Sequence, residues 1–104
     1  MKRIFWTAYC YHERIAAIYE IETIINQYGV ISDFKRFSDI SISFIIELED
    51  RKLDSLYIAL QQYLKLNDFE KINSNSNNET VIYLNTTFIH GTGNLKIEIP
   101  AVPG

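Results

Sequence analysis

The sequence is poor in cysteine, glycine and proline. Cys10 is its one cysteine, so no internal disulfide can form and nothing marks an oxidising compartment. The four glycines and two prolines form no linker-like run, and the sequence has no internal repeat. A chain of 104 residues is long enough for one hydrophobic core and too short for two. We therefore expect a single domain over residues 1–104.

Excess positive charge and long apolar runs are also missing. The net charge is −3 and the pI is about 5.3, so no overall positive field would attract nucleic acid or anionic lipid. No apolar run has membrane-spanning length, and the polar segment 11–14 interrupts the start too early for a signal peptide. We expect a cytoplasmic protein with no nucleic-acid partner and no membrane association.

The composition is typical of a globular domain, with 47% hydrophobic and 22% charged residues. The sequence also contains two amphipathic stripes. Apolar residues recur at helical steps at Ala17, Ile18, Ile21, Ile24, Ile25 and Tyr28, which predicts a helix over 12–28. Gly29 follows, where a left-handed terminating residue is usually needed. A second stripe predicts a helix from about residue 50 to 66, with Asp50 placed to accept hydrogen bonds from its first amides.

Alternation and residue type predict strands in the remaining segments: 4–11, 30–37, 40–49, 69–72, 81–89 and 95–99. The first six elements follow the order strand, helix, strand, strand, helix, strand. This order predicts an α+β, ferredoxin-like βαββαβ sandwich, in which two helices pack on one face of an antiparallel sheet. The last strands would add a hairpin-like extension at the C-terminus.

The other face of the predicted sheet is apolar. Phe5, Tyr9 and Tyr11 share one side of the first strand, and Ile45 adds to them from the third. A large exposed apolar patch is unusual on a small monomer and marks an interface or a ligand site. A second copy of the chain could cover it, giving a homodimer or higher oligomer, or the C-terminal segment 81–99 could fold over it.

Cys10, His12 and Glu13 form the one cluster of reactive side chains, where the first strand meets the first helix. A structural zinc site needs four ligands and a catalytic one about three, and His90 is the one further histidine. No nucleophile signature surrounds the cysteine. We expect no metal, no cofactor and no catalytic residue here, with the cysteine acting as a small buried hydrophobe.

An RNA-recognition domain shares the predicted element order, and Phe5 could imitate one of its base-stacking aromatics. The segment 41–46 lacks the basic-glycine-aromatic sequence of such domains, and the chain is acidic, so RNA binding is not expected. Gly91 and Gly93 precede an alternating strand rather than a helix, and therefore predict a hairpin turn rather than a phosphate loop.

The span Ile18 to Leu64 resembles ACT domains, small regulatory domains with the βαββαβ order and a glycine after the first helix. Gly29 stands at the position of that glycine. The resemblance implies paired domains that bind amino acids or similar small effectors near the glycine and the first strand-helix loop. It therefore assigns Gly29, Tyr11 and His12 to ligand binding.

The sequence thus predicts a non-catalytic module that self-associates and can bind a small-molecule effector at the subunit interface. It holds no complete set of acid, base and nucleophile that would indicate an enzyme. Two alternatives stay open. One is a small enzyme of the dimeric α+β barrel type, with an apolar pocket on the open sheet face and His12, His90 or Tyr9 as its polar group. The other is a domain that binds a different protein through the same face.

Overall fold

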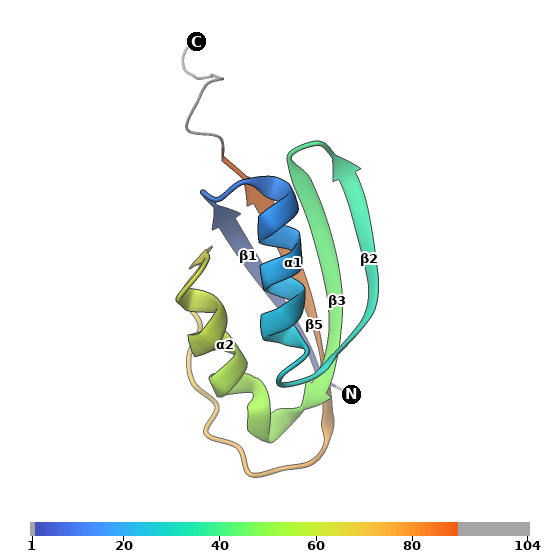
Figure 1. The fold of residues 1–104 in the computed structure, drawn as a ribbon. Coiled ribbons are helices and arrows are strands. Elements are labelled where there is room, and N and C mark those ends of the chain that lie inside the picture. The colour runs from blue at the N-terminus through green and yellow to red at the C-terminus, as the bar shows by residue number, and fades with distance from the viewer. Residues whose placement is uncertain (1, 90–104) are drawn as a thin grey trace.

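The computed structural model describes residues 2–89. Its elements are β1 (Lys2–Cys10), α1 (Arg14–Ile25), β2 (Val30–Ser38), β3 (Ser41–Glu49), the 3₁₀ helix η1 (Asp50–Lys52), α2 (Leu53–Gln61), β4 (Lys65–Leu66) and β5 (Glu79–Phe88). The strands form one mixed sheet in the order β2-β3-β5-β1-β4, and both helices lie on the same face of it (Figure 1). The α+β class with two helices on one sheet is confirmed.

The prediction of a wholly antiparallel sheet is wrong. β5 pairs with β1 in parallel and with β3 antiparallel, so it lies in the middle of the sheet. Its residues alternate between helix-facing side chains such as Leu84 and open-face side chains such as Tyr83, and both are apolar. A strand that is apolar on both sides suits a central position. The element order is therefore not a plain βαββαβ, because an additional strand separates β1 from β3.

The predicted strand over 69–72 is also wrong, because that segment is irregular. α2 ends at Gln61, earlier than predicted, and the chain pairs with β1 immediately afterwards through the two-residue β4. The segment 67–78 then crosses to β5, held by hydrogen bonds to the start of α2. Both carboxylate oxygens of Asp54 accept backbone N–H groups, from Ile72 at 3.1 Å and from Asn73 at 2.9 Å. The predicted last strand at 95–99 lies outside the described residues.

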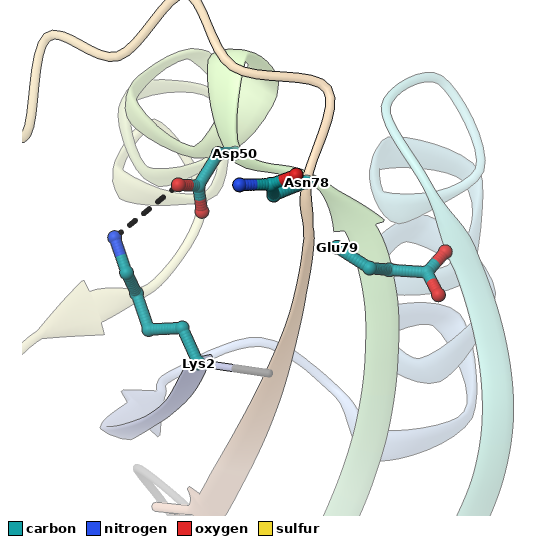
Figure 2. A pocket seen from close by; sticks show the side chains of 4 residues that line it. All are labelled: Lys2, Asp50, Asn78 and Glu79. Atoms are coloured by element: carbon teal, nitrogen blue, oxygen red, sulfur yellow. Dashed lines mark hydrogen bonds and ion pairs between the residues drawn. The ribbon is translucent and has the colours of Figure 1, made fainter.

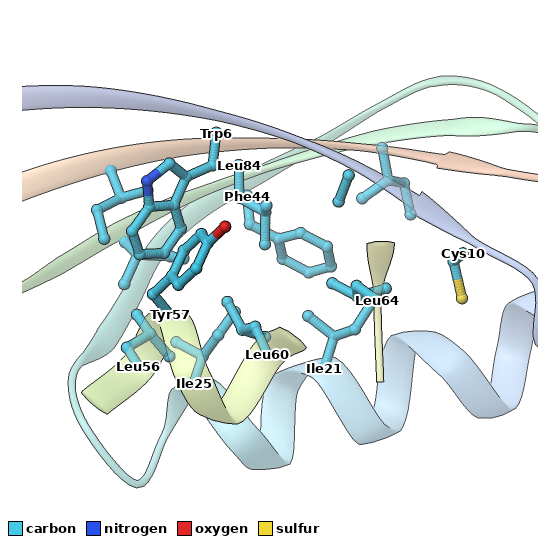
Figure 3. Packing of buried hydrophobic residues seen from close by; sticks show 14 of the residues in the cluster. Trp6, Cys10, Ile21, Ile25, Phe44, Leu56, Tyr57, Leu60, Leu64 and Leu84 are labelled. Atoms are coloured by element: carbon cyan, nitrogen blue, oxygen red, sulfur yellow. The ribbon is translucent and has the colours of Figure 1, made fainter. Parts of the chain in front are cut away.

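The hydrophobic core fills the space between the sheet and the two helices (Figure 3). Helix α1 contributes Ala17, Ile21 and Ile25, all fully buried, which confirms the predicted stripe. Trp6 from β1 reaches into the α2 side of this core. Its ring meets that of Tyr57 edge to face, with the ring centroids 5.4 Å apart. Such aromatic pairs contribute about 0.5 to 1.5 kcal/mol beyond the area they bury.

The two helices begin differently. The Glu13 carboxylate caps α1, accepting the backbone N–H groups of Ile15 and Ala16 at 2.9 Å each. Asp50 does not cap the second helix as predicted, because its carboxylate is bonded to Thr80 and Lys2 instead. None of the helices in the described part of the chain combines the length and apolarity needed to cross a membrane.

Candidate functional site

No helix of the described residues covers the face of the sheet opposite α1 and α2 (Figure 1). The strand register places Phe5 of β1, Tyr83 of β5 and Ile45 of β3 side by side in one row across this open face. The rings of Phe5 and Tyr83 stack with their centroids 4.9 Å apart and an interplanar angle of 14°. Phe5 remains 67% exposed, so the centre of the face presents an aromatic pair to solvent.

The predicted interface residues fall largely on this open face. Tyr9 lies two rows beyond Phe5 on β1, in register with Thr87 of β5, and is 44% exposed. Ile45 lies in the Phe5 row and is half-buried. Tyr11 lies past the last residue of β1 and is exposed as well. The structure thus places Phe5, Tyr9 and Ile45 on one face, with Phe5 and Ile45 in the same row, Tyr9 two rows away and Tyr11 at the margin.

Sequence reasoning missed Tyr83, because one of its two alternatives has the segment 81–99 fold over the face. The alternation of Val81 and Tyr83 with Ile82 and Leu84 was the available signal. It has the same two-sided apolar character as β1, where Phe5 and Tyr9 alternate with Trp6 and Ala8, and such a strand suits a central position in a sheet. β5 therefore forms part of the open face and does not cover it.

The edge strand β2 is less suited to association than the face. It is interrupted twice, by register shifts between Ile31 and Asp33 and between Arg36 and Ser38. Bulges and exposed charges such as that of Lys35 hinder another strand from pairing with an edge. A partner of this sheet is therefore better accommodated on its face than along β2.

The junction between β1 and α1 is a packing site. The imidazole of His12 stacks on the ring of Tyr63, with the centroids 4.1 Å apart and an interplanar angle of 10°. Cys10 is fully buried, and this burial raises the pKa of its thiol, an effect that a hydrogen bond with the His12 backbone reduces. A raised thiol pKa leaves little of the reactive thiolate at neutral pH. With Glu13 engaged as the helix cap, these residues serve the structure.

Burial also raises the pKa of Tyr63, with smaller electrostatic contributions from Cys10, Glu20 and Glu13. The phenol therefore keeps its proton at neutral pH and is no candidate base. Within residues 2–89 no group of three or more histidine, cysteine, aspartate or glutamate side chains could hold a metal ion.

Gly29 does not lie near this junction. Helix α1 has 12 residues, about 18 Å of helix, and Gly29 follows its far end, whereas Tyr11 and His12 precede its start (Figure 1). Its predicted left-handed conformation is wrong, since no glycine among the described residues has a positive φ. A Cβ on Gly29 would instead lie 2.5 Å from the Glu47 carbonyl oxygen. The glycine is needed for close packing of two backbone segments.

A polar hollow of about 330 Å³ lies where β1 and β5 begin, lined by Lys2, Asp50, Asn78 and Glu79. Figure 2 shows Lys2 reaching toward Asp50, with Nζ 3.3 Å from Oδ2, while Glu79 points the other way. Asp50 also accepts a short hydrogen bond from the Thr80 hydroxyl. That bond, with the Lys2 charge, holds the pKa of Asp50 below its usual range despite burial. The bonds of Asp50 to Lys2 and Thr80 thus join the end of β3 to the starts of β1 and β5.

No family model, curated protein or solved structure matches this chain.

Proposed function

We propose that this chain is a non-catalytic module that self-associates through the open face of its sheet. The observation that supports it is the stacked pair of Phe5 and Tyr83 in the middle of a face that no described helix covers. Ile45 flanks the pair on the β3 side, and Tyr9 adds another aromatic ring on β1, two rows from Phe5 and separated from it by Thr7. A large apolar side chain gains about 1.5 to 3 kcal/mol when it is fully removed from water. A second copy is the simplest cover, since most soluble oligomers are symmetric assemblies of one chain.

Effector binding at the subunit interface is not part of this proposal. It rested on a site shared by Tyr11, His12 and Gly29, and these residues lie at opposite ends of α1. His12 is stacked on Tyr63 and Gly29 is packed against Glu47, so each already has a structural role.

The enzyme alternative lacks a specific observation in its favour. It requires an enclosed pocket on the open face with a polar group beside it, whereas the hollow described above lies at the Lys2–Asp50 pair and is open to solvent. Tyr9 lies on the open face, but His12 is stacked on Tyr63, and His90 is outside the described residues.

Sedimentation equilibrium of the whole chain tests the proposal, over a range from about 1 μM to about 1 mM. We expect a reversible dimer that is weakened at least about tenfold by Phe5→Ser, because an apolar ring at the centre of an interface contributes most to binding. Phe5 is 67% exposed in the single chain, so the change should leave folding intact.

Tyr19→Ser is the matched control, because Tyr19 is 73% exposed on α1, in the helix layer. This variant should dimerise like the wild type. A chain that stays monomeric at every concentration would overturn the proposal and would leave a different protein, or residues 90–104, as the cover of the face. Equal weakening by both variants would also overturn it, because the contact would then not be the open face.

A further inference from the structure

The open face carries one row of residues in which opposite charges flank an apolar centre. In this row Arg3 of β1 and Glu47 of β3 stand on either side of Val81 of β5, as the register of both strand pairs shows. Arg3 is exposed and Glu47 is half-buried. The ion pairs among the described residues are those of Lys2 with Asp50 and of Arg51 with Glu49, so neither side chain in this row has an ionic partner there.

From this arrangement, and resting on the self-association proposed above, we infer that the second copy docks about a two-fold axis parallel to β5 and directly above it. Such an axis exchanges β1 with β3, because these strands flank β5 at equal spacings of about 4.8 Å. Residues in one row stay in the same row. Arg3 therefore faces the partner's Glu47, Phe5 faces the partner's Ile45, and Tyr83 faces the partner's Tyr83.

The other positions of a two-fold axis pair the charges badly. An axis above β3 would bring the two copies of Glu47 together, and one above β1 would bring the two copies of Arg3 together. An axis perpendicular to the strands would reverse the order of the rows and separate Arg3 from Glu47. The β5 axis also directs Glu79 toward the partner's Glu79, four residues along β5 from Tyr83. It nevertheless forms two opposite-charge pairs, whereas the axes above β3 and β1 form none, so charge favours the β5 axis.

The twist of β-sheets is compatible with this placement. Stacked sheets lie about 10 Å apart and cross at about 30°, which displaces the Arg3 and Glu47 backbones by roughly 4 Å when the crossing point is at Tyr83. Arginine and glutamate have long side chains that can span such an offset across the gap. Each copy supplies one arginine and one glutamate, so the dimer contains two of these pairs related by symmetry.

The size of the face indicates weak association. In this docking mode the long strands that overlap are β1, β5 and β3. At about 4.8 Å spacing, with roughly nine residues each at about 3.3 Å, they give an overlap of roughly 430 Å² per copy. A total of about 860 Å² lies below the usual range for stable complexes, so a dissociation constant of micromolar order or weaker is expected. In such an interface the charges set the orientation more than they raise the affinity.

Charge exchange tests the orientation by sedimentation equilibrium of the full chain at low salt. Arg3→Glu places a glutamate opposite the partner's Glu47, and Glu47→Arg places an arginine opposite the partner's Arg3. We expect each single variant to weaken the dimer at least about tenfold, and the double variant to restore it to within about threefold of the wild type. Lys71→Glu is the matched control, because this exposed lysine lies on the irregular segment that crosses beside α2, in the helix layer and away from the open face.

The outcomes separate this inference from the proposed function. A monomeric wild type would remove both. A wild-type dimer in which the double variant stays as weak as the single variants would overturn the β5 axis and leave self-association standing. Urea unfolding of each variant shows whether the fold itself is weakened. Arg3 and Glu47 lie on strands that do not pair with each other, so the free energy of unfolding of each variant should be within about 0.5 kcal/mol of the wild-type value.

Discussion

Gly29 lies so close to the backbone of Glu47 that a Cβ at residue 29 would stand 2.5 Å from the Glu47 carbonyl oxygen. It would also stand 2.7 Å from the Cβ of Leu48. The turn after α1 thereby presses directly on the end of β3. Since the φ of Gly29 is not positive, the missing side chain, rather than an unusual backbone conformation, is what this contact requires.

Gly29→Ala should therefore destabilise the fold by about 1 to 3 kcal/mol, the usual cost of forcing extra atoms into a packed region. Urea unfolding measures it. Asn26→Ala is the control, because Asn26 is exposed at the end of the same helix with ordinary helical φ and ψ. If Gly29→Ala instead raised stability by about 0.4 to 1 kcal/mol, as alanine does where it fits without strain, the close contact would be refuted.

Asp50 should make the free energy of unfolding depend on pH in the acid range. Its bond from Thr80 and the charge of Lys2 hold the pKa of Asp50 below its ordinary value in the folded protein. Folding therefore favours the charged form, and this contribution is complete above the unfolded pKa of about 3.9 and is lost as pH falls through the lower folded value. Asp50→Asn should cost about 1.5 to 3 kcal/mol near pH 7.

The stability gap between wild type and Asp50→Asn should narrow as the pH falls below about 4, which urea midpoints measured against pH would show. Glu70→Gln is the control, an exposed carboxylate on the irregular segment before β5. A gap that stays constant from pH 7 to about pH 2 would contradict the prediction, because the charge of Asp50 would then contribute nothing.

The helices were predictable because their signals are local. Ala17, Ile21 and Ile25 repeat at four-residue steps, and all three are buried as that spacing requires. The place of β5 was not predictable in this way, since it depends on which distant strands it pairs with. Phe5, Tyr9 and Ile45 could be assigned to the open face from alternation alone, whereas Tyr83 could be added only once β5 was placed beside β1.

The two wrong local assignments share a physical cause. Asp50 has the sequence position of a helix cap, but Thr80, 30 residues away, takes its carboxylate. Gly29 has the position of a left-handed helix terminator, but its conformation is ordinary and the constraint comes from the backbone of Glu47. In both places the neighbouring residues in the sequence indicate one role, but a contact with a distant part of the chain gives the residue a different one.

Tyr57 should stabilise the fold through its hydroxyl, which donates to the Asn67 carbonyl oxygen at 2.7 Å. Asn67 in turn is held to β1, since its backbone N–H donates to the Thr7 carbonyl oxygen and its side chain accepts the Thr7 N–H. Tyr57→Phe keeps the ring contacts and leaves a carbonyl without its donor, so a loss of about 1 kcal/mol is expected. Tyr19→Phe, on an exposed ring, should change the unfolding free energy by less than about 0.5 kcal/mol. Equal effects of the two changes would refute a role for the Tyr57 hydroxyl.

Cys10 should behave as a core residue rather than as a reactive thiol. It is fully buried, and the same burial raises the pKa of the thiol, so both access and thiolate fraction are low in the folded protein. Labelling by a thiol-specific disulfide reagent at pH 8 should therefore be at least about 100-fold slower in the native chain than in urea, with the rate set by opening of the fold. Cys10→Ala tests the packing role separately: it should lower the unfolding free energy by about 1 to 2 kcal/mol through the small cavity it leaves. Native labelling as fast as that of the unfolded chain would contradict the buried position and would return the cysteine to consideration as a nucleophile beside His12.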